Sequence, residues 1–121
     1  MRSIIAVKSK KFAIRVINLY KYLCKEKNEY IMSKQILRSG TSIGANAKEA
    51  VNAQSKAGFI NKMNIALKEA DETEYWLELL YETNYITCEQ FDSMIVDCRE
   101  LIRILTSIIK TTKNNMSIID N

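Results

Sequence analysis

The strongest constraint on the fold is the spacing of apolar residues toward the C-terminal end of the chain. From Phe91 to Ile109 they recur every three or four positions, which is the period of one face of an α-helix. The segment opens with Thr87-Cys88-Glu89-Gln90, in which Thr87 can cap the helix and Gln90 can reach back to it. The pattern predicts a helix over about residues 87–113, followed by a frayed tail over residues 114–121.

Three earlier segments show the same periodicity. They predict helices over about residues 9–26, 32–53 and 55–82, with Ser33 as the candidate N-cap of the second. Proline is absent from the 121 residues and glycine occurs only three times, so few residues oppose long helices. Four helices with short links predict a single all-α domain, an up-down-up-down antiparallel four-helix bundle over residues 1–121.

Two of the three glycines, Gly40 and Gly44, lie in the second predicted helix. Each lowers helix stability by roughly 0.5–1 kcal/mol relative to alanine, so either the helix breaks here or close packing offsets the penalty. Close packing is the favoured interpretation. In an antiparallel hairpin of the second and third helices, facing residue numbers sum to about 110, which sets Gly40 across from Ala70 and Gly44 across from Ala66.

The same register predicts polar contacts on either side of the glycines. Arg38 falls opposite Glu72 and one turn from Glu74, which predicts an interhelical ion pair. Asn46 falls opposite Asn64, a candidate buried amide contact. We therefore expect polar residues to hold this hairpin together around its close-packed centre.

Most catalytic chemistry lacks the residues it needs. The chain contains no histidine, which excludes Glu-x-x-His di-iron sites and Ser-His or Cys-His nucleophiles. Cys24, Cys88 and Cys98 have no metal-site spacing and are expected to be small buried residues on helices. The glycine pair lacks the Gly-Lys-Ser/Thr of a phosphate loop. We predict no catalytic, cofactor-binding or metal-binding residues, and no enzyme activity.

Charge is unevenly distributed along the chain. Residues 1–38 hold ten Lys or Arg and two Glu, whereas the second half of the third predicted helix is acidic. The basic part can contact RNA or DNA, form a solvated helix face, or meet the acidic helix of a neighbouring copy. The candidate nucleic-acid contacts are Lys8, Lys10, Lys11, Arg15, Lys21, Lys25, Lys27 and Lys34.

Some apolar residues fall outside the predicted buried faces. Ile14 and Ile17 lie off the stripe of the first helix, and Tyr75, Trp76 and Tyr81 form a large aromatic group on the third. For Ile14 and Ile17, either the apolar stripe of the first helix is simply broad, or the two side chains contact another copy of the chain. The aromatic residues are expected to form an oligomer interface. No apolar run approaches the ~20 residues that a membrane span needs, so we expect a cytoplasmic protein without a membrane partner.

Several stretches resemble the bacterial four helix bundle protein family, whose members are also called 23S rRNA intervening-sequence proteins. They are Phe-Ala-Ile-Arg-Val-Ile-Asn-Leu-Tyr-Lys-Tyr-Leu (12–23), Ser-Lys-Gln-Ile-Leu-Arg-Ser-Gly-Thr-Ser-Ile-Gly-Ala-Asn (33–46), Glu49-Ala50, and Ile-Ala-Leu-Lys-Glu-Ala-Asp-Glu-Thr-Glu-Tyr-Trp-Leu (65–77). The resemblance implies an antiparallel four-helix bundle that assembles into a ring-like homopentamer, mostly without an assigned function. A related branch, the accessory variability proteins of diversity-generating retroelements, comprises basic pentamers that bind a reverse transcriptase and nucleic acid.

The resemblance also marks recurrent polar positions. In this chain they are Arg38, Asn46, Glu49, Glu72 and Glu74, which with Gly40 and Gly44 make up a predicted structural lock. Many relatives carry proline at the position of Gly44, which leaves a kink in the second helix open. The sequence thus favours a non-enzymatic homo-oligomer, pentameric by resemblance, with a nucleic-acid-binding accessory protein as the alternative.

Overall fold

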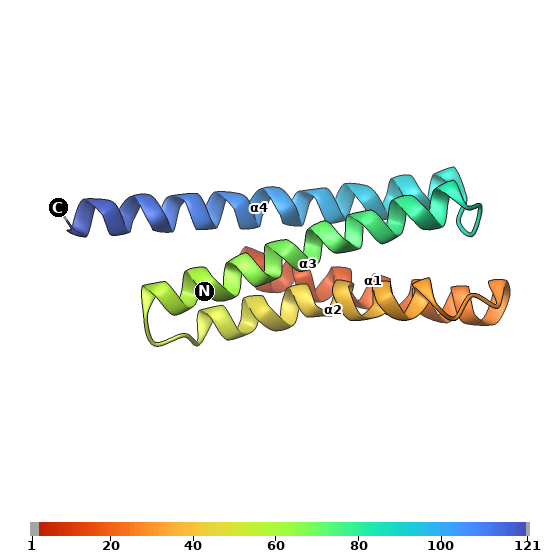
Figure 1. The fold of residues 1–121 in the computed structure, drawn as a ribbon, viewed down its shortest axis with the longest axis horizontal. Coiled ribbons are helices and arrows are strands. Elements are labelled where there is room, and N and C mark those ends of the chain that lie inside the picture. Colours follow the sequence, from red (N-terminus) through yellow and green to blue (C-terminus); the bar gives the residue numbers. More distant parts are fainter. Residues whose placement is uncertain (1–2, 121) are drawn as a thin grey trace.

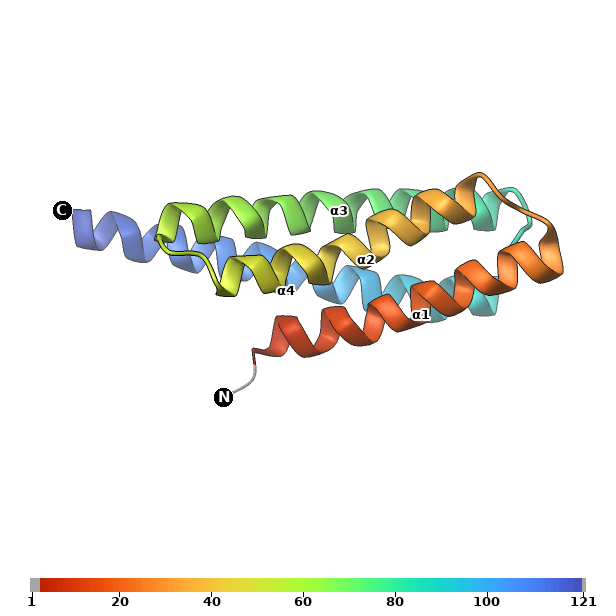
Figure 2. The same cartoon turned by 90° about the horizontal axis from the view of Figure 1, so that it is seen from below.

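The computed structural model describes the backbone of residues 3–120 and the side chains of residues 3–115. Four helices follow one another, α1 (Ile4–Lys27), α2 (Met32–Val51), α3 (Lys56–Glu82) and α4 (Cys88–Asp120), and residues 3–120 contain no strand. Consecutive helices run antiparallel and lie side by side, as Figures 1 and 2 show. Contacts join α1 to α2, α2 to α3, α3 to α4 and α4 to α1, so α1 and α3 occupy opposite corners. The predicted all-α antiparallel four-helix bundle is confirmed.

The core is built from the predicted apolar stripes. Each helix turns one face inward, and burying a large apolar side chain contributes roughly 1.5–3 kcal/mol. The largest buried side chains include Phe12 and Leu23 of α1, Ile36 and Ile43 of α2, Met63, Leu77 and Leu80 of α3, and Leu101 and Leu105 of α4. No helix in the described part of the chain is long and apolar enough to cross a membrane.

Helix α1 begins earlier, and helix α4 ends later, than the sequence predicts. Helix α1 begins at Ile4 rather than near Ser9, because Ile5 is buried seven positions before Phe12 on the same face. The frayed tail predicted over residues 114–121 is wrong as far as Asp120, where α4 ends, and Asn121 lies outside the described residues. No glycine or proline interrupts this segment, so it lacks the residues that oppose helix most strongly. In Figure 1 the C-terminal turns of α4 extend past the link between α2 and α3.

Two helix starts show which capping predictions hold. At α4, the backbone N–H of Gln90 donates to Thr87 Oγ1 at 3.1 Å and the N–H of Thr87 donates to Gln90 Oε1 at 2.8 Å, so the capping box is confirmed. Ser33 is wrong as the cap of α2, since it is buried inside the helix. Glu29 Oε1 instead accepts the backbone N–H groups of Ile31 at 3.1 Å and Ser33 at 2.8 Å.

Candidate functional site

The glycines of α2 pack closely against a neighbouring helix, as predicted, but the neighbour is α1 and not α3. A Cβ added to Gly40 would lie 2.7 Å from both Cγ atoms of Val16, and one added to Gly44 would lie 3.2 Å from Ser9 Oγ. Helix α2 runs without a break through both positions. The predicted pairing with Ala70 and Ala66 is wrong, because Ser39, one residue before Gly40, is the position that faces α3.

The α2–α3 register itself is confirmed. Thr73 Oγ1 donates to Ser39 Oγ at 2.9 Å in the core, and Arg38 donates to the Glu72 carboxylate. Arg38 also donates to Glu69 Oε2 at 3.0 Å, a partner that the sequence reasoning missed although it lies one turn from Glu72. The Arg38 side chain remains 49% exposed, so these ion pairs contribute at most about 1 kcal/mol.

The other residues of the predicted lock do not gather around Arg38. Glu74 faces α4, where Arg99 Nε donates to its Oε2 at 2.8 Å. Asn46 donates to the Ser42 carbonyl of its own helix at 2.8 Å and Asn64 is exposed, so the predicted amide contact is wrong. Glu49 pairs with Lys62 of α3 at 3.4 Å. These residues therefore fix two separate helix seams and form no single site.

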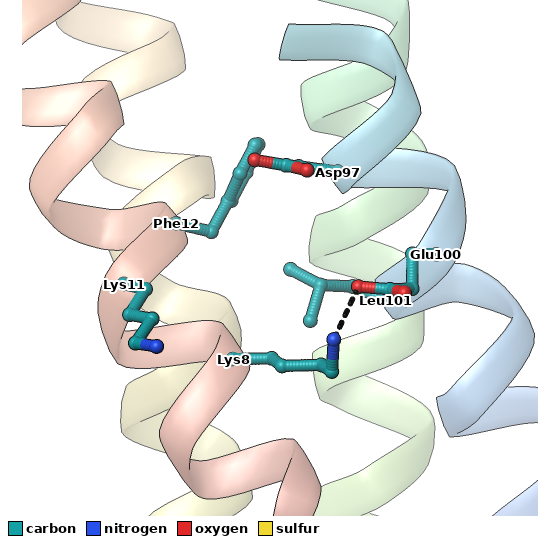
Figure 3. Close-up of a pocket in the computed structure, with 6 residues that line it drawn as sticks. All are labelled: Lys8, Lys11, Phe12, Asp97, Glu100 and Leu101. Carbon is teal, nitrogen blue, oxygen red and sulfur yellow. Dashed lines mark hydrogen bonds and ion pairs between the residues drawn. The ribbon is translucent and has the colours of Figure 1, made fainter. Parts of the chain in front are cut away.

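The seam between α1 and α4 is polar and has the fewest contacts of the four seams. Lys8 Nζ lies 2.9 Å from Glu100 Oε1, and Arg15 Nη1 lies 2.6 Å from Asp97 Oδ2. Figure 3 shows Lys8 reaching Glu100. Both residues line a small hollow of about 110 Å³, which Leu101 also lines. Two of the eight candidate nucleic-acid contacts are thus engaged by carboxylates of the same chain.

A wider groove lies between the N-terminal half of α1 and the C-terminal end of α2. It has a volume of about 640 Å³ and is lined by Ser3, Ala6, Val7, Lys10, Lys11, Ile14, Lys48, Val51 and Asn52. Two of the apolar side chains that line it are strongly exposed, Ile14 at 51% and Val51 at 55%. Ile17, 36% exposed, follows Ile14 by three positions on α1 but does not line the groove. Three lysines and no carboxylate line it. We call this surface the basic groove.

The aromatic group of α3 does not form the single surface predicted from the sequence. Trp76 Nε1 donates to Glu72 Oε2 of the same helix at 3.2 Å, and its ring meets the Tyr75 ring edge to face with centroids 5.2 Å apart. Tyr81 stacks on Phe91 of α4 with ring centroids 4.8 Å apart. Tyr75 is the most exposed of the three at 54%, and Tyr81 is 37% exposed. Tyr75 shares its helix face with three acidic residues, and we call Asp71, Tyr75, Glu78 and Glu82 the acidic stripe.

The cysteines differ in environment. Cys98 is buried, as predicted, and burial raises the pKa of its thiol to about 12, helped by the nearby Glu74 carboxylate. Cys88 is exposed and Cys24 is half-buried, so the prediction of three buried cysteines is wrong for Cys88. No cluster of cysteine and carboxylate side chains in the described part of the chain could hold a metal ion.

The comparisons with known proteins agree with the fold. The sequence model of the family described as 23S rRNA-intervening sequence protein matches residues 2–107. Among solved structures, a protein of unknown function from the S23 ribosomal protein family of Bacteroides thetaiotaomicron is 63% identical, with a TM-score of 0.88. That similarity covers 88% of this chain and 99% of the other. No curated protein matches the chain.

Proposed function

Because the chain belongs to the 23S rRNA-intervening sequence protein family, we propose that it works as a non-enzymatic helical-bundle protein that assembles into a homo-oligomer. The proposed number of subunits is five, which follows the family resemblance of its sequence. The observation that carries the proposal is the exposure of Ile14 and Val51, which both line one groove. Clustered exposed apolar side chains of this kind mark association surfaces.

The charge pattern supports self-association as well. The basic groove and the acidic stripe belong to the same chain, so any two copies carry complementary surfaces. An exposed free thiol at Cys88 fits the reducing cytoplasm, which we propose as the location.

The test is sedimentation velocity over a series of protein concentrations. We expect a species of about 70 kDa, five times the 14.0 kDa of one chain, to dominate and to persist on dilution. Sedimentation at 14.0 kDa throughout the series would reject the proposal.

A second candidate function is nucleic-acid binding. Its support is the exposure of six of the eight candidate lysines and arginines, Lys10, Lys11, Lys21, Lys25, Lys27 and Lys34. Lys8 and Arg15 are occupied by Glu100 and Asp97 and are left out of this surface. The apolar floor of the groove would gain nothing from phosphates, which is why association with another copy is the first proposal.

Salt dependence tests this second function. If six phosphates are contacted, the logarithm of the binding constant for a structured RNA should fall with the logarithm of the salt concentration at a slope of about −5. The Lys21→Ala variant should make this slope shallower, because one phosphate contact is lost, and Lys8→Ala should leave the slope unchanged. Absence of binding to RNA and DNA at low salt would remove this candidate.

A further inference from the structure

We propose that the basic groove of one copy receives the acidic stripe of the next copy, with Tyr75 seated on the apolar floor between the lysines. This inference rests on the proposed self-association and names the two surfaces that would produce it. The contact is therefore heterologous: each copy offers its basic groove to one neighbour and its acidic stripe to another.

The basic groove has the chemistry needed to bind the acidic stripe of another copy. Within the described residues, Lys10, Lys11 and Lys48 form no ion pair, whereas Lys8 and Arg15, which face α4, do. An apolar floor with an unpaired cationic rim suits an aromatic side chain flanked by carboxylates. Lysine side chains can also cover a tyrosine ring with their stems while their ammonium groups meet the acids.

The acidic stripe has the matching chemistry. Asp71, Tyr75, Glu78 and Glu82 are spaced four, three and four positions apart, so they share one face of α3. Its acidic members form no ion pair within the described residues. Burial, with Glu74 nearby, raises the pKa of Asp71, as expected of a carboxylate without a cation beside it. Tyrosine is among the residues that most often anchor protein interfaces.

The two surfaces lie on opposite sides of the bundle. Helices α1 and α3 occupy opposite corners, Ile14 lies on the far side of α1 from the buried Phe12, and Tyr75 lies on the far side of α3 from the buried Thr73. The stripe therefore cannot reach the groove of its own chain. For the same reason two copies cannot exchange both contacts across a two-fold axis, so successive contacts lead to a ring or a filament.

Two single substitutions separate the surfaces. Ile14→Asp places a carboxylate in the groove and Tyr75→Glu removes the anchor of the stripe, and both sites are exposed in the protomer. Each variant alone should sediment at the 14.0 kDa of one chain, with the helical circular dichroism of the wild type. Matched controls are Ile31→Asp and Tyr30→Glu, because Ile31 is 78% and Tyr30 is 52% exposed at the α1–α2 link. Both controls should assemble as the wild type does.

Mixing the two variants tests the heterologous arrangement directly. The Tyr75→Glu chain keeps an intact groove and the Ile14→Asp chain keeps an intact stripe, so one contact can form and no other. An equimolar mixture should therefore give a single species of about 28 kDa and nothing larger. If Ile14→Asp perturbs the circular dichroism, Lys48→Glu replaces it as the groove variant.

The outcomes distinguish this inference from the proposed function. If the wild type and both variants assemble alike, self-association stands and the assignment of the two surfaces is overturned. If both variants are monomeric but their mixture shows no 28 kDa species, the contact is not heterologous between these surfaces. A monomeric wild type would reject the proposed function itself, and this inference with it.

Discussion

The substitution Gly40→Ala tests the close contact between α1 and α2. The new methyl group would lie 2.7 Å from both Cγ atoms of the fully buried Val16, whereas unstrained carbon contacts lie near 3.5–4.0 Å. Overpacking of this kind lowers stability by about 1–3 kcal/mol, and the better helix propensity of alanine returns up to about 1 kcal/mol. We expect a net loss of about 1–2 kcal/mol.

Thermal unfolding followed by circular dichroism measures this loss. For a domain of this size it corresponds to a decrease in Tm of roughly 5–10 °C. Protein concentration must be held constant, because association shifts the apparent stability. Gly44→Ala is the matched control: its Cβ would lie 3.2 Å from the Oγ of Ser9, which can adjust, and the expected change stays within about 0.5 kcal/mol.

A double-mutant cycle identifies the neighbour of Gly40. Val16→Ala removes the two methyl groups that the new Cβ would strike, so Gly40→Ala should be much less harmful in that background. An unchanged or higher Tm for Gly40→Ala would refute the close-packing argument. If Ala70→Gly and not Val16→Ala restored the stability of Gly40→Ala, position 40 would contact α3, as the sequence register predicts.

Three further predictions concern single groups. Glu29→Ala should destabilise the protein by about 0.5–2 kcal/mol in thermal unfolding, because two backbone N–H groups at the start of α2 lose their acceptor. A thiol reagent at pH 8 should modify the exposed Cys88 quickly and the buried Cys98 only after unfolding. Burial raises the pKa of Cys98 to about 12, so little of its reactive thiolate is present at this pH. Rapid labelling of Cys98 in the folded protein would contradict this prediction. In denaturant titrations Arg38→Ala should lose less than about 1 kcal/mol, whereas Thr73→Val, which breaks a buried hydrogen bond, should lose about 1–3 kcal/mol; the reverse order would contradict the assignment of these contacts.

Helical periodicity and local chemistry made much of the fold predictable. The apolar spacing after Phe91 and the Thr87–Gln90 capping box depend only on neighbours within two turns, and both are confirmed. The pairing of Arg38 with Glu72 was predictable because a short link fixes the register of an antiparallel hairpin. The cap of α2 was not, since Ser33 fits the local pattern while the acceptor is Glu29 in the preceding link.

The neighbours of each helix face were harder to predict. Positions 39 and 40 differ by about 100° around α2, which is enough to turn one toward α3 and the other toward α1. Periodicity locates the buried face but does not say which side of it each neighbour covers. The same limit applies to Lys8 and Arg15, whose carboxylate partners lie on α4, three links further along the chain.

Native mass spectrometry of the wild-type chain tests the central claim most directly, because it counts the subunits. A self-associating bundle whose heterologous contacts close into a ring of five predicts one main species of about 70 kDa. A spectrum containing only the 14.0 kDa chain would contradict self-association. A ladder of masses without a preferred number of subunits would contradict the closed ring.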